Sequence, residues 1–379
     1  MTCGLEALSM DLLLIAQSAR MLAQSASLAG FGVYAIDCFG DDDLCHLSEA
    51  SIAVDNFDEA SLFTAIGAIA PSSGEFALVY GSGIDTRPAL LEKLARNYKV
   101  LGNLPPTLNQ INNPLNFSHL LDYLGVPYPE TCFSTPNPSA DWLSKPIGRE
   151  GGKSISFYAN RQLPSANVYY QRFMQGEAHS LLFLANGKGI RSIGFNTQWT
   201  SQHDLAQPFL FGGAVNRTNL SARQRKSVES YATKLTAAVG LVGLNSLDFI
   251  AENGRCWVLE INARPSASMA LYDEDFAEGL LALHIASCLG ELPPPGHHAG
   301  PVRALSIVYN PNTMTIPFDF GWPEGYADIP RGGTRIESGQ PLCSILVQGN
   351  DRQAVETLVK LQEQKILSGL QRNQEDQYD

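Results

Sequence analysis

The sequence predicts a protein in which an α/β domain with a parallel sheet is followed by a larger α+β region. Strand-like apolar runs alternate with helical patterns from Asp11 to about Leu101, and strand-like runs dominate the rest of the chain. The 379 residues are too many for one ordinary core, so we expect two or three packed domains. With 44% hydrophobic and 17% charged residues, the composition is typical of a soluble globular protein.

The N-terminal segment predicts the order strand, helix, strand, helix, strand. Its strand candidates are DLLLIA, FGVYAID, FALVYG and KVLG, and its helix candidates are SARMLAQSASLAG, which ends at Gly30, and RPALLEKLAR. This alternation indicates a parallel sheet with helices on its faces. The loop GSGID at residues 81–85 follows a strand, where open α/β sheets bind ligands, but it lacks the glycine pattern of a dinucleotide site.

Charge, cysteine usage and hydropathy exclude several classes of protein. A net charge of −12 with no basic run argues against nucleic acid as a partner. Seven cysteines scattered singly indicate reduced thiols, with neither a disulfide framework nor a zinc site. The longest apolar runs are too short to span a bilayer, and the first residues do not resemble a secretory leader. We therefore expect no membrane partner and a cytoplasmic location.

The middle of the chain predicts a helix, a turn-rich linker and a glycine-rich loop. FSHLLDYLG is a helix closed by Gly125, and WLSKPIGREGGKSISFY predicts a strand that delivers Lys145, a loop from Gly148 to Lys153 and a returning strand. Glycines let backbone N–H groups approach anionic oxygens, and Arg149 and Lys153 add positive charge. The spacing does not fit a P-loop, and taken alone the segment also fits a surface hairpin with a basic tip.

The most informative segment is LDFIAENGRCWVLEINARP, residues 247–265. Asn253-Gly254 predicts a tight hairpin turn between two apolar strands. Side chains two apart on a strand share a face, so Glu260, Asn262 and Arg264 project together, and Asp248 pairs across the hairpin within their reach. Two carboxylates and an amide oxygen suit a magnesium ion that carries phosphate oxygens. The alternative is an amphipathic hairpin with a solvated polar face.

The pattern D-x(11)-E-I-N-x-R resembles the metal-binding end of the ATP-grasp superfamily, enzymes that join a carboxylate to an amine or similar nucleophile through an acyl phosphate. GVPYPET is similar to the linker that follows a helix in that family, and KPIGREGG to its nucleotide loop. The resemblance implies an ATP-grasp fold with an N-terminal Rossmann-like domain (1–104), a two-lobed ATP-binding core (105–295), a small C-terminal β barrel (296–368) and a disordered tail (369–379).

The resemblance also implies ATP and Mg²⁺, or Mn²⁺, as cofactors, and roles for single residues. Catalytic cations would be Arg264, Lys145 and Lys153, and metal ligands would be Asp248, Glu260 and Asn262. Nucleotide contacts would come from Lys145, Gly151, Gly152, Gln171, Phe173, Met174 and Glu177, of which Gln171, Phe173 and Met174 match the adenine hinge and Glu177 the ribose ligand. One departure is Asn113-Pro114, which stands where the family commonly has Asp-Lys, so the group that replaces this lysine is open.

The implied reaction is phosphorylation of a substrate carboxylate by Mg·ATP, followed by attack of an amine on the acyl phosphate. YGSG, KPIGREGG, LEINARP and DIPRGG together resemble a biotin-carboxylase-related subgroup that includes tyramine–glutamate ligases of methanofuran biosynthesis. We therefore expect glutamate and an amine such as tyramine, in the biosynthesis of a one-carbon cofactor. The alternatives are an ATP- and bicarbonate-dependent carboxylase that acts through carboxyphosphate, and a nucleotide-binding assembly partner without activity. Dimers are common in the family, so a homodimer is one expected assembly.

Overall fold

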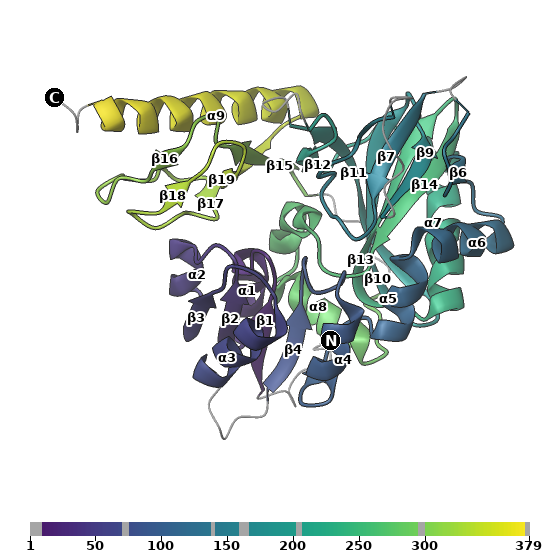
Figure 1. Cartoon of the computed structure of the whole chain (residues 1–379), viewed down its shortest axis with the longest axis horizontal. Coiled ribbons are helices and arrows are strands. Elements are labelled where there is room, and N and C mark those ends of the chain that lie inside the picture. Colours follow the sequence, from purple (N-terminus) through teal and green to yellow (C-terminus); the bar gives the residue numbers. More distant parts are fainter. Residues whose placement is uncertain are drawn as a thin grey trace.

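The computed structural model of this protein describes residues 10–69, 76–137, 141–158, 167–201, 207–294 and 300–375. They form three regions that follow one another along the chain (Figure 1). An N-terminal domain lies below the C-terminal strands in that view, and the core lies to the right of both. Among the described residues, no helix is both long enough and apolar enough to cross a membrane.

A five-stranded parallel sheet in the order β3-β2-β1-β4-β5 is the centre of the N-terminal domain. Leu13 and Ile15 of the first strand pack on one face and Leu12 and Leu14 on the other, as expected for a sheet that is covered on both sides. The strands are β1 (Asp11–Ile15), β2 (Val33–Asp37), β3 (Ala50–Ala53), β4 (Phe76–Tyr80) and β5 (Lys99–Val100), and the helices are α1 (Arg20–Leu28), α2 (Asp42–His46), α3 (Glu59–Ile69) and α4 (Pro88–Ala95).

The predicted parallel sheet is confirmed, but the sequence analysis missed three elements between β2 and β4. The third strand is only four residues long and largely half-exposed, so it shows neither a buried run nor a clear alternation. Helix α2 is a single short turn, and α3 carries apolar residues around most of its surface. None of the three therefore has the periodicity from which elements are recognised in a sequence.

A short helical linker leads from this domain into a small antiparallel lobe. Helices α5 (Pro105–Ile111) and α6 (Pro114–Leu124) precede a four-stranded sheet in the order β6-β9-β7-β8. The side chain of Asn113 accepts hydrogen bonds from the N–H groups of Leu115 and Asn116, and Pro114 occupies the first position of α6. The sheet strands are β6 (Thr131–Cys132), β7 (Trp142–Pro146), β8 (Ser156–Phe157) and β9 (Val168–Arg172).

The large sheet has eight strands in the order β14-β13-β10-β11-β12-β15-β19-β17. One face packs on α7, whose Val228 belongs to the same buried cluster as Leu247 and Phe249, and the other packs on α8, whose Leu281 shares a second cluster with Leu182. Its core strands are β10 (Glu177–Asn186), β11 (Ile190–Thr200), β12 (Phe211–Val215), β13 (Val242–Glu252) and β14 (Arg255–Asn262), and its helices are α7 (Ala222–Val239), α8 (Gly279–Cys288) and two 3-10 turns at Ala267–Leu271 and Asp273–Asp275.

The predicted hairpin between β13 and β14 is confirmed. Asn253 and Gly254 have φ values of 50° and 77°, the positive angles that a tight primed turn requires. Asp248 pairs directly with Glu260, and the register shifts by one residue immediately beyond this pair. The shift is a β-bulge, which commonly re-aims side chains next to functional sites.

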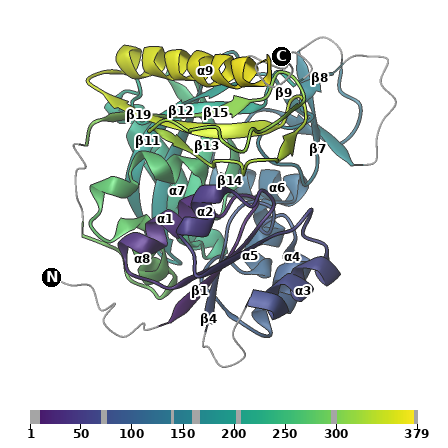
Figure 2. The same cartoon turned by 90° about the vertical axis from the view of Figure 1, so that its left-hand side faces the viewer.

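The C-terminal strands continue the large sheet, whereas the sequence predicted a separate small barrel. β12 pairs with β15, and β15 with β19, so one sheet spans the core and the C-terminal region. The elements are β15 (Val302–Tyr309), β16 (Met314–Thr315), β17 (Tyr326–Ala327), β18 (Arg335–Ile336), β19 (Pro341–Gly349) and α9 (Arg352–Glu375). Figure 2 shows α9 lying along β15 and β19.

The predicted disorder from residue 369 was wrong for residues 369–375, because α9 continues to Glu375. The reason is apolar packing: Ile366 and Leu370 are buried in the C-terminal hydrophobic cluster and hold the last turns of the helix. The tail is otherwise polar, so the sequence did not indicate that Leu370 would be buried. Residues 376–379 lie outside the described part of the chain.

Ionic contacts join the N-terminal domain to the C-terminal region, where α1 and α2 lie beneath the C-terminal strands (Figure 1). Arg20 Nε lies 3.1 Å from Asp328 Oδ1, and Asp43 accepts hydrogen bonds from the backbone N–H groups of Asp328 and Ile329. Asp41 is buried beside them. Burial, reinforced by the negative charge of Asp328, raises the pKa of Asp41 to about 8.

Candidate active site

The polar residues of the β13–β14 hairpin form one connected group. Asn262 Nδ2 donates to Asp248 Oδ2 at 3.1 Å, and Asn262 Oδ1 accepts from Arg264 Nη2 at 3.2 Å. Ser246 Oγ donates to Asp248 Oδ1 at 3.1 Å, so the aspartate is held from both sides. The predicted clustering of Asp248, Glu260, Asn262 and Arg264 on one face therefore agrees with the geometry.

The electrostatics of this group fit a divalent cation. Burial raises the pKa of Asp248, and the charge of Glu260 opposite raises it further. Glu260 is exposed and has no hydrogen bond or ion pair among the described residues. Two facing carboxylates and the amide oxygen of Asn262 form a hard oxygen donor set, and a bound Mg²⁺ or Mn²⁺ would relieve their repulsion. Asp248, Glu260 and Asn262 would hold such an ion.

Arg264 is the most strongly engaged residue of the site. Its Nε donates to Asp85 Oδ2 at 2.9 Å, and its Nη2 lies 3.4 Å from Glu150 Oε2. Burial alone would lower the pKa of Arg264, but the charges of Asp85 and Glu150 outweigh it and raise the pKa above its ordinary value. Burial raises the pKa of Asp85 even beside Arg264, and the Glu150 charge adds to the rise. Sequence reasoning missed both acids, although Asp85 ends the GSGID loop it had marked.

Lys145 lies buried in the small lobe. Its Nζ donates to Gln171 Oε1 at 3.0 Å, and Gln171 in turn donates to Thr131 Oγ1 at 3.2 Å. The ammonium also lies 5.8 Å from the centre of the Tyr169 ring. Gln171, which was predicted for adenine, therefore positions Lys145.

The glycine-rich loop is folded down onto the segment before β12. Phe211 N donates to Gly151 O at 2.9 Å. Gly152 has a φ of 75°, and a Cβ there would overlap the carbonyl oxygen of Phe209, so only glycine allows this approach. The backbone N–H of Lys153 donates to Glu150 O at 3.3 Å, but its exposed side chain makes no hydrogen bond or ion pair among the described residues, so the predicted catalytic lysine is not joined to the metal strands.

At Met174 the hinge between the lobes has main-chain groups without a partner among the described residues. Phe173 N is already bonded to Asp141 O, and Gln175 N donates to Glu252 Oε1 at 2.8 Å. Between them, neither N–H nor C=O of Met174 has a partner among the described residues. A free donor and acceptor at this point are what the edge of adenine needs. The Phe173 ring packs on Phe157 at a centroid distance of 5.1 Å.

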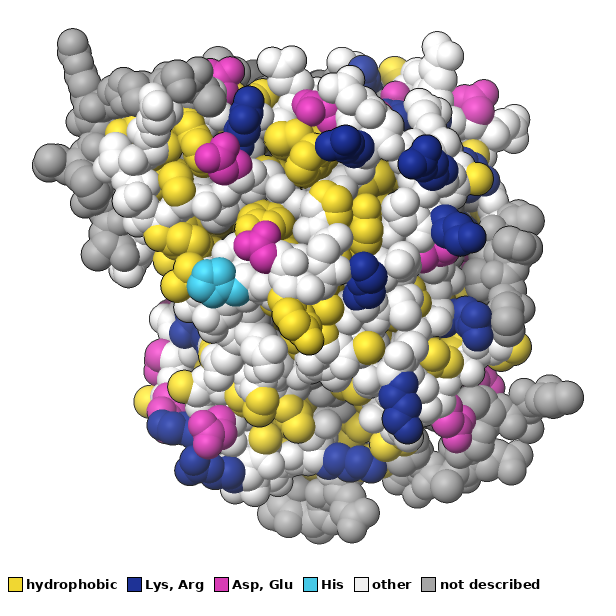
Figure 3. All heavy atoms as spheres, turned by 90° about the vertical axis from the view of Figure 1, so that its right-hand side faces the viewer, with side chains coloured by type: hydrophobic (Ala, Val, Ile, Leu, Met, Phe, Trp, Pro, Cys, Tyr) yellow, Lys and Arg dark blue, Asp and Glu magenta, His cyan; other side chains and the backbone are white. Residues whose placement is uncertain are grey.

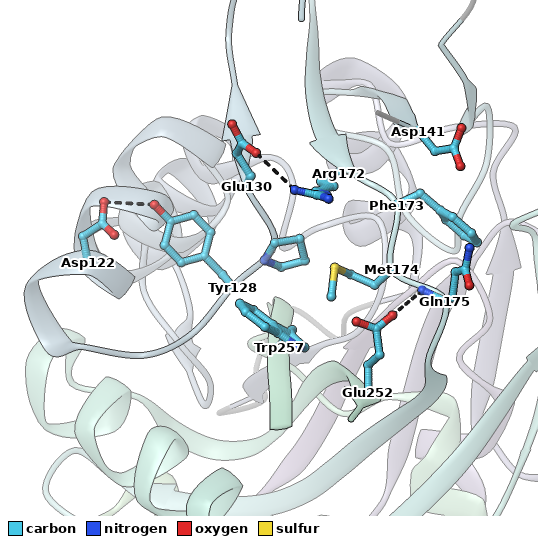
Figure 4. A pocket seen from close by; sticks show the side chains of 11 residues that line it. Asp122, Tyr128, Glu130, Asp141, Arg172, Phe173, Met174, Gln175, Glu252 and Trp257 are labelled. Atoms are coloured by element: carbon cyan, nitrogen blue, oxygen red, sulfur yellow. Dashed lines mark hydrogen bonds and ion pairs between the residues drawn. The ribbon is translucent and has the colours of Figure 1, made fainter. Parts of the chain in front are cut away.

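A cavity of about 770 Å³ opens beside this hinge (Figure 4). Tyr128, Met174, Glu252 and Trp257 surround it, and Figure 4 shows Met174 above Trp257. None of the predicted metal ligands lines it. Glu252 is four residues from Asp248 along β13, a distance of roughly 13 Å at about 3.3 Å per residue. The cavity therefore lies at the turn end of the hairpin, away from the metal strands.

Glu177 pairs with two residues, Arg352 and His179. Its Oε1 lies 3.0 Å from Arg352 Nη1 of α9, and its Oε2 lies 3.2 Å from His179 Nε2. Burial lowers the pKa of His179, although Glu177 opposes the shift. A ribose would compete with both partners. Arg87 likewise has a structural role, because it donates to the carbonyl oxygen of Phe57 at 3.0 Å.

The same part of the chain matches a known protein family. The model of the ATP-grasp domain family matches residues 111–268, a range that includes Lys145, the hinge and all the metal strands. Residues 111–268 are therefore similar to an ATP-grasp domain. The confirmed fold is accordingly an ATP-grasp fold, with a parallel five-stranded N-terminal domain and antiparallel lobes.

Solved ATP-grasp structures superimpose over nearly the whole chain at low identity. Biotin carboxylase from Campylobacter jejuni, in a complex with β,γ-ATP, has a TM-score of 0.70 at 12% identity and covers 92% of this chain and 90% of its own. N5-carboxyaminoimidazole synthetase from Staphylococcus aureus, complexed with ADP, has a TM-score of 0.69 at 15% identity, covering 93% and 97%. L-amino acid ligase from Bacillus licheniformis has a TM-score of 0.69 at 15% identity, and the match covers 93% of this chain and 96% of the ligase.

Figure 3 shows the outer face of the molecule on the side of α6, α7 and β14. Apolar side chains there form separate groups among Lys and Arg side chains. Tyr123 of α6 is 86% exposed, but single exposed apolar residues are normal on a surface. A homodimer therefore stays a prediction.

Proposed function

We propose that this protein is an ATP-dependent, ADP-forming ligase that joins a carboxylate to an amine. The observation that carries the proposal is the joint arrangement of the Asp248, Glu260 and Asn262 donor set, the adjoining Arg264 and the buried Lys145 of the opposite lobe. Oxygen ligands for a metal, together with cations for phosphate oxygens, are typical of phosphoryl transfer. The ATP-grasp domain supports the same reading.

In the proposed reaction the terminal phosphoryl group of ATP passes to the substrate carboxylate, and the amine then displaces phosphate from the acyl phosphate. The chain needs no nucleophile of its own, because positioning and charge stabilisation provide the catalysis. A Mg²⁺ ion, when bound, neutralises the charge of the β- and γ-phosphate oxygens. Asp248, Glu260 and Asn262 would hold it, Lys145 would contact phosphate, and Arg264 would balance charge at the acyl group.

The remaining residues of the nucleotide site would position and enclose ATP. The free main-chain groups of Met174 suit adenine, Gly151 and Gly152 bring the loop close to the phosphates, and Lys153 adds charge when the nucleotide is bound. Glu177 would hold the ribose after exchanging its present partners. Closure of the loop would keep water from the acyl phosphate.

Glutamate and an amine such as tyramine, in one-carbon cofactor biosynthesis, are the substrates that the sequence motifs favour. The fold neighbours include an L-amino acid ligase, which supports an amino acid as one substrate class. The neighbours also include a biotin carboxylase and an N5-carboxyaminoimidazole synthetase, so an ATP- and bicarbonate-dependent carboxylase is the second candidate. An inactive nucleotide-binding partner is the third, supported by the Asn113-Pro114 departure alone.

One experiment separates the three candidates. Phosphate release from Mg·ATP is measured while amino acids, amines and bicarbonate are supplied singly and in pairs. Release that requires an amino acid and an amine supports the ligase, and release that requires bicarbonate supports the carboxylase. Nucleotide binding without release in any combination would support the inactive partner and refute both enzymes.

A further inference from the structure

Glu150 connects three parts of the molecule. It lies in the glycine-rich loop between Gly148 and Gly151, and its Oε1 accepts a hydrogen bond from the N–H of Gly83 at 3.2 Å. Its Oε2 lies 3.4 Å from Arg264 Nη2. Gly83 belongs to the loop after β4 of the N-terminal domain, and Arg264 follows β14 of the core. One carboxylate therefore joins the nucleotide loop, the N-terminal domain and the metal strand.

The two donors that Glu150 uses are held by other residues. Gly83 has a φ of 91°, and a Cβ at this position would come within 2.8 Å of Phe57 Cε2, so the backbone lies directly against that ring. Arg264 is fixed through its Nε by Asp85, and both side chains are at least nine-tenths buried, with exposures of 10% and 6%. A backbone N–H beside a guanidinium is a pair of donors suited to one carboxylate.

We propose that the Gly83 N–H and the Arg264 guanidinium form the binding site for the carboxylate of the acyl substrate, and that Glu150 occupies this site when substrate is absent. The inference rests on the proposed function and deepens it. Glu150 is an internal competitor that an incoming carboxylate displaces. Because Glu150 sits on the loop that closes over the nucleotide, its displacement couples substrate arrival to movement of that loop.

Burial supports this assignment over a chance surface contact. The Glu150 side chain is 20% exposed, although its neighbours Arg149 and Gly151 lie in an open loop. The Gly152 backbone lies directly against the Phe209 carbonyl, and this contact limits where the loop can lie relative to the site. The acid therefore enters the site from a loop whose other residues mostly face solvent.

The test uses hydrogen exchange on the full-length chain without nucleotide, followed by mass spectrometry of peptides that contain Gly83. Glu150→Ala removes the acceptor, and exchange at Gly83 should become faster by on the order of tenfold, the factor that one net hydrogen bond corresponds to. Excess acetate should restore protection in Glu150→Ala by binding the vacated donors. Glu92→Ala is the matched control, because Glu92 is an exposed acid of α4 that pairs only with Arg96.

Equal exchange at Gly83 in the wild type and in Glu150→Ala would overturn the proposal, as would failure of acetate to protect the folded variant. Should Glu150→Ala lose its fold, Glu150→Gln keeps the side-chain volume without the charge. Acetate must then protect Gly83 more in Glu150→Gln than in the wild type, and an equal response overturns the proposal. Thermal shifts with Mg·ADP on the same proteins distinguish the two hypotheses: absent nucleotide binding refutes the proposed function, whereas a failed acetate response refutes only this site.

Discussion

Asp248 of β13 and Glu260 of β14 stand directly opposite each other across an antiparallel strand pair. Like charges in this position repel, and a sheet normally avoids them. The raised pKa of Asp248, caused first by burial and then by Glu260, is the electrostatic consequence. A cation bound between the two carboxylates, as we propose, would relieve this repulsion.

Replacing Glu260 by Gln should leave the fold intact and remove most ATP turnover. Loss of one charge from such a site costs about 3 kcal/mol of barrier, roughly a hundredfold in rate. Turnover on the substrate pair found by the phosphate-release screen measures this, and calorimetry should show that Mg²⁺ no longer strengthens ADP binding. Glu92→Gln, on the surface of α4, serves as the control. Near-normal turnover in Glu260→Gln would remove the metal assignment.

Replacing Lys145 by Met should weaken ADP binding without unfolding the small lobe. The methionine keeps the buried volume, but the cation that Gln171 holds is lost. A hydrogen bond to a charged group contributes about 1.5–3 kcal/mol, so the dissociation constant should rise roughly 10- to 100-fold. Isothermal titration with ADP measures the change. Lys188→Met, at the exposed turn before β11, is the control and should bind ADP like the wild type.

Two glycines of the nucleotide loop offer a matched pair of variants. Gly148 and Gly152 have φ values of 76° and 75°, so Ala at either position carries the same backbone strain of about 1 kcal/mol. Only at Gly152 would the new Cβ also overlap the Phe209 carbonyl, whereas at Gly148 it meets nothing within 4 Å. Tryptic cleavage after Lys153 should therefore be faster in Gly152→Ala than in Gly148→Ala. Equal cleavage rates would show that the loop does not rest on Phe209.

Replacing Asp41 by Asn should change how stability depends on pH. Burial raises the folded-state pKa of Asp41 to about 8, far above its unfolded value near 4, so the folded chain binds more protons between these limits. Its contribution to stability therefore falls as pH rises from about 4 to 8, by up to about 1.4 kcal/mol per pH unit. Asp41→Asn should be more stable than the wild type at pH 8 and gain little near pH 4.

Urea denaturation across that range checks the Asp41 prediction. The exposed neighbour Asp42 provides the control, since Asp42→Asn removes the same charge from the same helix without touching the buried cluster. A pH profile of Asp41→Asn parallel to that of the wild type would mean that Asp41 is ionised in the folded chain.

The sequence contained the features that local chemistry determines. The Asn253-Gly254 turn and the two-residue strand period were enough to bring Asp248 to Glu260. The period could not reveal Asp85 or Glu150, because their contacts to Arg264 span 179 and 114 residues and depend on how three regions pack. Gln171 shows another limit, because the sequence placed it in a strand-like run but could not show its hydrogen bond to Lys145, which depends on the packing of β7 against β9.

The C-terminal region shows why packing decides what composition leaves ambiguous. Its strands were recognised one by one, yet only the β12–β15 pairing makes them part of the core sheet. The tail reads as polar because a helix on one side of a sheet needs few apolar residues, and here Ile366 and Leu370 are buried at its end.

The ion pair between Arg20 and Asp328 links the N-terminal and C-terminal regions of the described chain. The N-terminal domain is followed by the core, and the core sheet includes the C-terminal strands β15, β19 and β17. The loop after β17 contacts α1 of the N-terminal domain through Asp328. A cut at the C-terminal boundary would strip Arg20 of its nearest anion and leave Asp41 and Asp43 without their neighbouring backbone. We therefore expect that neither the N-terminal domain nor the C-terminal region folds as a separate fragment. When the nucleotide lobe moves, these two regions should stay in contact with each other.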